Sequence, residues 1–280
     1  MEAGHAFRAM KGILTRELYR YLQQKTRFFA ALVRPMLWLL VFGTGFRNVL
    51  ELSVLEPYGT PIPYHQYLIP GLVAMIFLFN GMQSSLSMVY DRELGVMRLL
   101  LTAPLPRWYL ILGKLIASTT VSILQAYLFL LVCLFAGYLS LGLNLIIILP
   151  FFVLCGLLLA AVGLVLSIYI QQIENFAGAM NFVIFPMFFL SSALYPLSQI
   201  NENSVAMYWL TMINPFTHVV ELLRFGLYGQ VESSALFIVM AYASLFVFVG
   251  IKGYSVSSSK VKIKQKKEPA ILAALPRSHG

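Results

Sequence analysis

The sequence predicts an all-α, polytopic membrane protein with six transmembrane helices. Three observations support this prediction: 59% of the 280 residues are hydrophobic, only 11% are charged, and the apolar residues gather in long runs. A soluble globular domain carries roughly 25% charged residues, far more than this chain has. Inside a bilayer the backbone polar groups must be satisfied within the protein, which favours α-helices. The composition therefore argues against a soluble enzyme.

Six apolar runs recur along the chain, and each is close to the roughly 20 residues that cross the hydrocarbon core of a bilayer. The six runs are residues 28–46, 68–90, 108–137, 145–170, 176–196 and 235–250, within a transmembrane domain over residues 28–250. Arg34, near the start of the first run, is expected to extend its charged end to the membrane interface. Cys133 and Cys155 lie inside apolar runs and are expected to be small buried hydrophobes without a disulfide.

The segments outside the runs differ in charge, and this difference predicts their side of the membrane. Residues 1–27 hold six Lys or Arg residues. Their apolar positions recur every three or four residues, which predicts an amphipathic helix in the cytoplasmic membrane interface. Residues 251–280 hold seven more basic residues and are expected to form a disordered cytoplasmic tail. The segments 47–67 and 198–232 hold two basic and five acidic residues. Because cytoplasmic loops carry the excess of Lys and Arg, both termini are predicted to be cytoplasmic.

The segment between the second and third runs, residues 91–107, reads DRELGVMRLLLTAPLPR. Asp91 is a candidate N-cap, and Pro104 and Pro106 would end a helix that starts there. Three apolar residues of this segment would share one helical face. The pattern predicts a short cytoplasmic helix suited to docking, although a plain juxtamembrane turn explains it equally well.

The segment between the fifth and sixth runs is too long for a tight turn. Asn214 followed by Pro215 places a capping side chain before a proline at the first helical position. Glu221 and Arg224, three residues apart, can form an ion pair. We expect a short amphipathic helix that dips into the outer leaflet. Its role as a cap, a gate or an anchor stays open.

Three blocks of sequence resemble the permease subunits of ABC-2 type (type-2 ATP-binding-cassette) exporters. The blocks are ELGVMRLLLTAPLPR, FPMFFLSSALYPLSQI and NPFTHVVELLRFGLYG. Their order and their spacing relative to the runs also fit, and the resemblance extends from Lys11 to Gly250. It is nearest to drug-resistance and nodulation-factor export permeases.

The resemblance implies a role for several segments. Residues 91–101 would be the coupling helix that docks into the ATPase subunit, and residues 5–27 an interface helix beside it. The coupling residues that it implies are Asp91, Arg92, Glu93, Gly95, Val96, Met97 and Arg98. The residues that it implies in short extracellular re-entrant helices are Asn214, Pro215, Glu221 and Arg224. Polar residues in the second and fifth runs would line the translocation pathway or hold helices together by hydrogen bonds. They are Asn80, Gln83, Ser84, Asn181 and Ser191.

The energy source separates the possible functions. The middles of the six runs hold no Asp, Glu or His, which disfavours a carrier coupled to an ion gradient. The runs also hold no catalytic cluster for an intramembrane enzyme. No GxxxxGK[ST] phosphate loop occurs, because Gly113 and Lys114 are followed by Leu115. We therefore expect ATP to be bound by a separate subunit, with no cofactor or metal in this chain.

The sequence thus predicts the permease of an ATP-binding-cassette exporter, without an ATPase site of its own. Its cargo is expected to be amphipathic or hydrophobic, either a lipid-linked saccharide or a drug-like molecule. The expected partners are an ATP-binding-cassette ATPase, a second permease copy or homologue, and membrane lipid, but no nucleic acid. The expected location is the inner (cytoplasmic) membrane of a bacterial cell. The alternatives are an ion-coupled membrane carrier and a non-transporting regulatory membrane subunit.

Overall fold

The structure, a computed structural model, describes residues 3–23, 25–45, 63–94, 106–139, 142, 144–170 and 172–274. Every regular element in these ranges is an α-helix, as predicted. The helices are α1 (Ala3–Gln23), α2 (Lys25–Gly45), α3 (Tyr64–Glu93), α5 (Arg107–Phe135), α6 (Asn144–Ile147), α7 (Leu149–Tyr169), α8 (Ile173–Phe189), α9 (Leu197–Asn203), α10 (Val205–Ile213), α11 (Pro215–Leu227) and α12 (Ser233–Ala274). Most of the predicted coupling helix lies outside the described residues.

Within the described ranges, four helices are long and apolar enough to cross a membrane. They are α3, α5 from Trp108, the joined α6 and α7 over Asn144–Tyr169, and α12 over Ser233–Gly253. Two further apolar helices are shorter, namely Phe29–Gly43 within α2 and Ile173–Phe189, which is α8. The four long helices fall on the predicted second, third, fourth and sixth runs. The two short ones fall on the first and fifth.

The prediction of one continuous helix over residues 176–196 is wrong at its C-terminal end. The helix α8 ends at Phe189, and turns occupy most of residues 190–196. Ser191 contributes to this ending, because its hydroxyl donates to the carbonyl oxygen of Phe188 at 2.6 Å. Serine side chains compete in this way with the helical backbone. Side chains of α3 and α11 donate hydrogen bonds to carbonyl groups just beyond this helix end.

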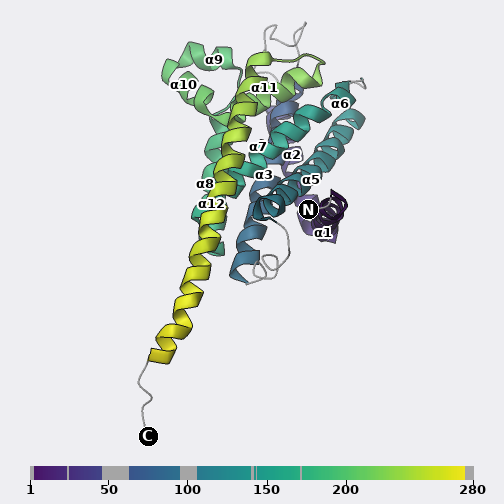
Figure 1. Cartoon of the computed structure of the whole chain (residues 1–280). Coiled ribbons are helices and arrows are strands. Elements are labelled where there is room, and N and C mark those ends of the chain that lie inside the picture. Colours follow the sequence, from purple (N-terminus) through teal and green to yellow (C-terminus); the bar gives the residue numbers. More distant parts are fainter. Residues whose placement is uncertain are drawn as a thin grey trace.

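The last helix is longer than predicted. α12 continues to Ala274, past residue 250, where the sixth run ends. Residues 251–274, which we expected to be disordered, are therefore helical. Residues 254–268 contain neither glycine nor proline and include five Lys, one Gln and one Glu, which are good helix formers. Figure 1 shows this part of α12 extending beyond the other helices.

The helix α3 lies at the centre of the bundle and packs most extensively against α7. Glycines permit this close approach. A Cβ atom at Gly81 would lie 2.7 Å from the carbonyl oxygen of Leu159 in α7, and one at Gly163 would lie 2.8 Å from the carbonyl oxygen of Gly81. Small residues at helix contacts are typical of membrane bundles, because they allow backbones to approach closely.

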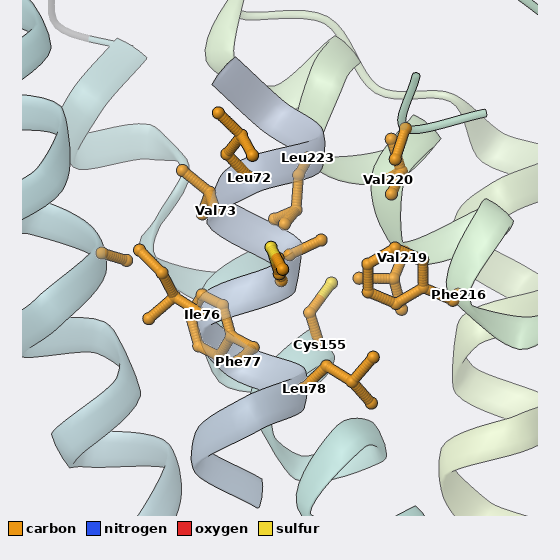
Figure 2. Packing of buried hydrophobic residues seen from close by; sticks show 14 of the residues in the cluster. Leu72, Val73, Ile76, Phe77, Leu78, Cys155, Phe216, Val219, Val220 and Leu223 are labelled. Carbon is orange, nitrogen blue, oxygen red and sulfur yellow. The ribbon is translucent and has the colours of Figure 1, made fainter. Parts of the chain in front are cut away.

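The helix α11 belongs to the core. Phe216, Val219, Val220 and Leu223 are fully buried, and Figure 2 shows them among side chains of α3 and beside Cys155 of α7. The short helix predicted after Asn214 is therefore present as α11, and it is buried on nearly all sides within the protein.

The bundle has two distinct ends (Figure 1). The α11 end consists of α6, α9, α10 and α11 with the first turn of α3. The α1 end consists of α1, the last turn of α3 and the first turns of α5 and α8. The N-terminal helix and the C-terminal extension of α12 both lie toward the α1 end.

Candidate functional site

Four charged residues meet at the α1 end and form the Asp91 cluster, which consists of Asp91, Lys114, Arg16 and Arg20. Asp91 lies in the last turn of α3, with its side chain only 6% exposed. Lys114 Nζ of α5 lies 2.8 Å from Asp91 Oδ2. From α1, Arg20 Nη1 lies 3.5 Å from Asp91 Oδ1 and Arg16 Nη2 lies 3.9 Å from Oδ2. One carboxylate therefore joins three helices.

The prediction that Asp91 caps a separate cytoplasmic helix is wrong. Asp91 lies inside α3, which continues to Glu93. Its carboxylate faces α1 and α5 instead of the backbone N–H groups that follow it. A carboxylate buried from water needs cationic or hydrogen-bonding partners, and the nearest ones come from other helices.

The two residues after Asp91 contact two further helices. Arg92 Nη1 donates to the carbonyl oxygen of Ser167, near the end of α7, at 3.1 Å. The backbone N–H of Ile173, the first residue of α8, donates to Glu93 Oε2 at 3.3 Å. A carboxylate at a helix N-terminus is stabilised by the helix dipole. The other predicted coupling residues, Gly95, Val96, Met97 and Arg98, lie outside the described residues.

The N-terminal helix α1 lies along α5. A Cβ atom at Gly113 of α5 would lie 3.2 Å from the side chain of Ile13. Further along, Gln125 Nε2 donates a hydrogen bond to the hydroxyl of Tyr21. The predicted interface helix is therefore packed against the bundle over most of its length.

At the α11 end, residues 190–196 form the α8 break, between α8 and α9. Backbone carbonyl groups that leave a helix away from water need other donors. Two tyrosines of α3 supply them: Tyr64 donates to the carbonyl oxygen of Leu194 and Tyr67 to that of Ser192, each at 2.8 Å. Sequence reasoning missed both tyrosines, because nothing local marks a tyrosine hydroxyl in an apolar run as the partner of a distant carbonyl.

Arg224 of α11 is the charged group at the α8 break and is only 3% exposed. Its Nη2 donates to the carbonyl oxygen of Ser192 at 2.8 Å, and its Nη1 donates to Glu221 Oε1 at 2.5 Å. The guanidinium carbon also lies 4.0 Å from the centre of the Tyr67 ring, a cation–π contact. The predicted ion pair between Glu221 and Arg224 is therefore present, but Arg224 is buried against the α8 break.

Asn214 connects the start of α11 to the end of α8. Its Oδ1 accepts from the backbone N–H of Phe216 at 3.0 Å, and Pro215 is the first residue of α11, so the predicted N-cap is confirmed. Its Nδ2 donates to the carbonyl oxygens of Met187 at 2.7 Å and Leu190 at 2.6 Å. The Asn214 side chain thus caps the start of α11 and donates hydrogen bonds to carbonyl groups at the end of α8.

A polar pocket of about 60 Å³ lies between α1, α3 and α5. It is lined by Glu17, Arg20, Tyr21, Asn80, Gln83, Ser84, Ser87, Ala117, Ser118 and Val121. Three of the predicted pathway residues, Asn80, Gln83 and Ser84, therefore come together here. Asn80 Nδ2 also donates to Gln125 Oε1 at 2.5 Å, which links it to Tyr21.

The other two predicted pathway residues lie elsewhere. Asn181 is exposed on α8. Ser191 is 1% exposed and belongs to the α8 break. Neither residue lines the polar pocket.

The described ranges contain no group of three or more His, Cys, Asp or Glu residues that could hold a metal ion. Cys133 and Cys155 are buried free thiols, in agreement with the expectation that they are small core residues.

Comparisons with known proteins agree with the resemblance of the sequence blocks. A family model described as ABC-2 type transporter matches residues 8–228. The ycf38 protein of Cyanophora paradoxa, whose name describes a transport permease, is 29% identical over 226 residues, which cover 76% of this chain and 72% of that protein.

Two bacterial relatives are also similar. The YbhR protein of Escherichia coli (strain K12), whose name describes a multidrug ABC transporter permease, is 29% identical over 187 residues, or 66% of this chain and 50% of that protein. Nodulation protein J of Rhizobium leguminosarum bv. viciae is 24% identical over 201 residues, or 71% of this chain and 74% of that protein. Because the family model covers most of the chain, the protein belongs to the ABC-2 type transporter family and is a transmembrane permease subunit that works with an ATP-binding ATPase subunit.

Proposed function

We propose that this chain is the permease of an ATP-binding-cassette exporter in the inner membrane of a bacterial cell. Two copies, or this chain and a homologue, pair with two ATPase subunits that bind the ATP, and this chain itself binds no cofactor. The cargo is amphipathic or hydrophobic, either a lipid-linked saccharide or a drug-like molecule, and it leaves the cytoplasm. The ATPase acts on the permease through residues 91–101.

The observation that carries this proposal is the anchoring of residues 91–93. Asp91 is bound to α1 and α5, Arg92 to α7 and Glu93 to α8. A displacement of the segment that follows would therefore be transmitted to four helices at once. A mere turn between two membrane helices does not need such connections.

The orientation follows from the charges. The α1 end carries Arg16, Arg20 and Lys114 around a single aspartate, and basic residues are in excess on the cytoplasmic side. In the proposed orientation the α1 end faces the cytoplasm and the α11 end faces outward.

Six crossings are supported by the positions of the two short apolar helices. α2 ends beside the start of α3, since a Cβ atom at Gly43 would lie 3.1 Å from His65 Cβ. α8 starts beside Glu93 and ends at the α8 break, so it also connects the two ends of the bundle. Its 17 residues span about 26 Å, and the α8 break covers the remaining depth of the hydrocarbon core.

A second permease copy is supported by one face of α8. Phe182, Phe185 and Phe189 are 80%, 45% and 45% exposed, and Gly178 and Asn181 lie on the same face. A helix face that contacts only lipid carries apolar side chains. A glycine and an amide on one face are typical of contact with another helix in the membrane.

Purification from the native membrane in a mild detergent tests the proposed function. An ATP-binding-cassette ATPase is expected to co-purify with the chain, and reconstitution with it is expected to stimulate ATP hydrolysis. A chain that purifies without any ATPase, and that leaves ATP hydrolysis unchanged after reconstitution, would contradict the proposal.

Glu93→Ala tests the coupling contact itself. The substitution removes the hydrogen bond to the first N–H of α8, a loss comparable to that of a helix cap. We expect the stimulation of ATP hydrolysis by the permease to fall about fivefold, while the melting temperature falls by only about 2–4 °C. Glu202→Ala, which removes an exposed carboxylate of α9 at the α11 end, is the matched control and should retain full stimulation.

Asp91→Asn tests whether the Asp91 cluster holds α1 in place. Without the carboxylate charge, Arg16, Arg20 and Lys114 repel one another, and the loss in stability should be about 1–3 kcal/mol. We expect α1 to detach, so that trypsin cleaves after Arg8, Lys11 and Arg16 at least several-fold faster. Glu174→Gln, which neutralises an exposed carboxylate on α8, should leave this cleavage unchanged. Equal cleavage of both variants would show that the cluster does not hold α1.

A further inference from the structure

The polar pocket contains more hydrogen-bonding capacity than packing requires. Part of this capacity is used within the protein, because Asn80 donates a hydrogen bond to Gln125 and Gln125 donates one to Tyr21. The pocket is also lined by Gln83, Ser84, Ser87 and Ser118, which carry one amide and three hydroxyl groups. The Ser118 hydroxyl oxygen is fully buried and has no hydrogen-bond partner among the described residues. A buried hydroxyl without a partner is costly, so a bound polar group is expected to satisfy it.

The depth of the pocket places these groups inside the bilayer. Asn80 precedes Asp91 by about 16 Å along α3, and Ser118 follows Lys114 by about 6 Å along α5. The pocket therefore extends from the Asp91 cluster to near the middle of a hydrocarbon core of about 30 Å. An amphiphile can place its polar head there between the helices while its apolar tail stays in lipid.

The charges and the size of the pocket restrict the head of such an amphiphile. Glu17 and Arg20 at the mouth have opposite charges, and Arg20 is already paired with Asp91. The deeper lining is uncharged and combines polar side chains with the apolar Ala117 and Val121. A volume of about 60 Å³ accommodates about four to six water-sized groups, since one water needs about 10–15 Å³. The fit is therefore to a small, uncharged polyol of about the size of glycerol.

We propose that the polar pocket binds the uncharged, hydroxyl-bearing head of an amphiphile that approaches from the cytoplasmic half of the bilayer. The identification of this ligand as cargo rests on the proposed function, whereas binding itself does not. Because α1 forms one wall and is held by Asp91, a bound head would also stabilise the position of α1 beside the coupling segment.

The test uses the full chain in lipid nanodiscs with Ser84→Cys as the probe. Methyl methanethiosulfonate is expected to modify this thiol, while the native Cys133 and Cys155 stay protected by burial. Addition of 1-octanoylglycerol should slow the modification at least fivefold. Octyl sulfate and octyltrimethylammonium, which carry the same tail length with charged heads, should not. Asn175→Cys, exposed on α8 away from the pocket, is the control thiol that no amphiphile should protect.

A second substitution checks the hydroxyl at the centre of the proposal. Ser118→Ala in the Ser84→Cys background removes one hydrogen bond and should weaken protection about threefold to tenfold. Ser118→Leu fills the pocket and should abolish protection. If Ser118→Leu is less stable than the protein with Ser84→Cys alone, the protection measured with Ser118→Ala decides whether this hydroxyl contributes to binding.

Three results would overturn the proposal: no modification of the probe thiol, equal protection by all three amphiphiles, or protection by octyl sulfate alone. The last result would assign the pocket to an anionic lipid. Protection by 1-octanoylglycerol in a chain that fails to recruit an ATPase would refute the proposed function and leave the binding site standing.

Discussion

Arg224→Ala is expected to lower the free energy of unfolding by about 3–5 kcal/mol, the typical cost of breaking a buried ion pair. The guanidinium is 3% exposed and donates both to Glu221 and to the carbonyl oxygen of Ser192. Its removal leaves the Glu221 carboxylate without its partner and takes one donor from the α8 break. Thermal unfolding in detergent, followed by circular dichroism, should show a large drop in melting temperature. Lys252→Ala, which removes an exposed cation on α12, should leave it nearly unchanged.

A paired substitution identifies the cause of this loss. In the double variant Glu221→Gln and Arg224→Met, no unpaired charge remains and the apolar contact with Tyr67 is partly kept. It should therefore be more stable than Arg224→Ala, because the largest cost of breaking a buried pair is the charge left behind. Equal melting temperatures of Arg224→Ala and wild type would show that the guanidinium is not needed to support the α8 break.

Gly81→Ala should destabilise the bundle by about 3 kcal/mol, the upper part of the usual range for overpacking. The added Cβ atom would lie 2.7 Å from the carbonyl oxygen of Leu159, and 2.9 Å from both the Cα and the backbone nitrogen of Ala160. These are backbone atoms, so no side chain can rotate away and α3 must separate from α7. Denaturant or thermal unfolding of the purified variant measures the loss.

Gly12→Ala is the matched control, because nothing lies within 4 Å of a Cβ atom at Gly12 in α1. Without a clash, the higher helix propensity of alanine should stabilise the protein by up to about 1 kcal/mol. If both glycine variants unfold at the wild-type temperature, α3 and α7 do not approach as closely as the structure shows.

The long helices could be predicted from sequence because their signal is local. An uninterrupted apolar run is sufficient to predict α5 and the joined α6 and α7, and the observed bounds differ little from the predicted ones. The N-cap at Asn214 and the pair of Glu221 with Arg224 are local as well, since their partners lie within three residues. Such features depend on neighbours along one helix and can be read without knowledge of the fold.

The α8 break could not be predicted, because the groups that complete it come from distant parts of the chain. Residues 176–196 are apolar enough to continue as one helix. The distant residues Tyr64, Tyr67, Asn214 and Arg224 supply donors for the carbonyl groups of the interrupted helix. The position of Asp91 was misjudged for the same reason. Its sequence fits a helix start, but its partners Arg20 and Lys114 lie on other helices.

The two bonds from Asn214 to α8 have a consequence for the order of events during biosynthesis. When the ribosome has made the chain only as far as residue 213, neither Asn214 nor Arg224 exists to donate hydrogen bonds to the carbonyl oxygens of Met187, Leu190 and Ser192. Without those donors, an apolar segment pairs the most backbone N–H and C=O groups when it forms an unbroken helix. The nascent fifth segment would thus insert as a longer rod, and it would be remodelled into its final interrupted shape only after α11 leaves the ribosome.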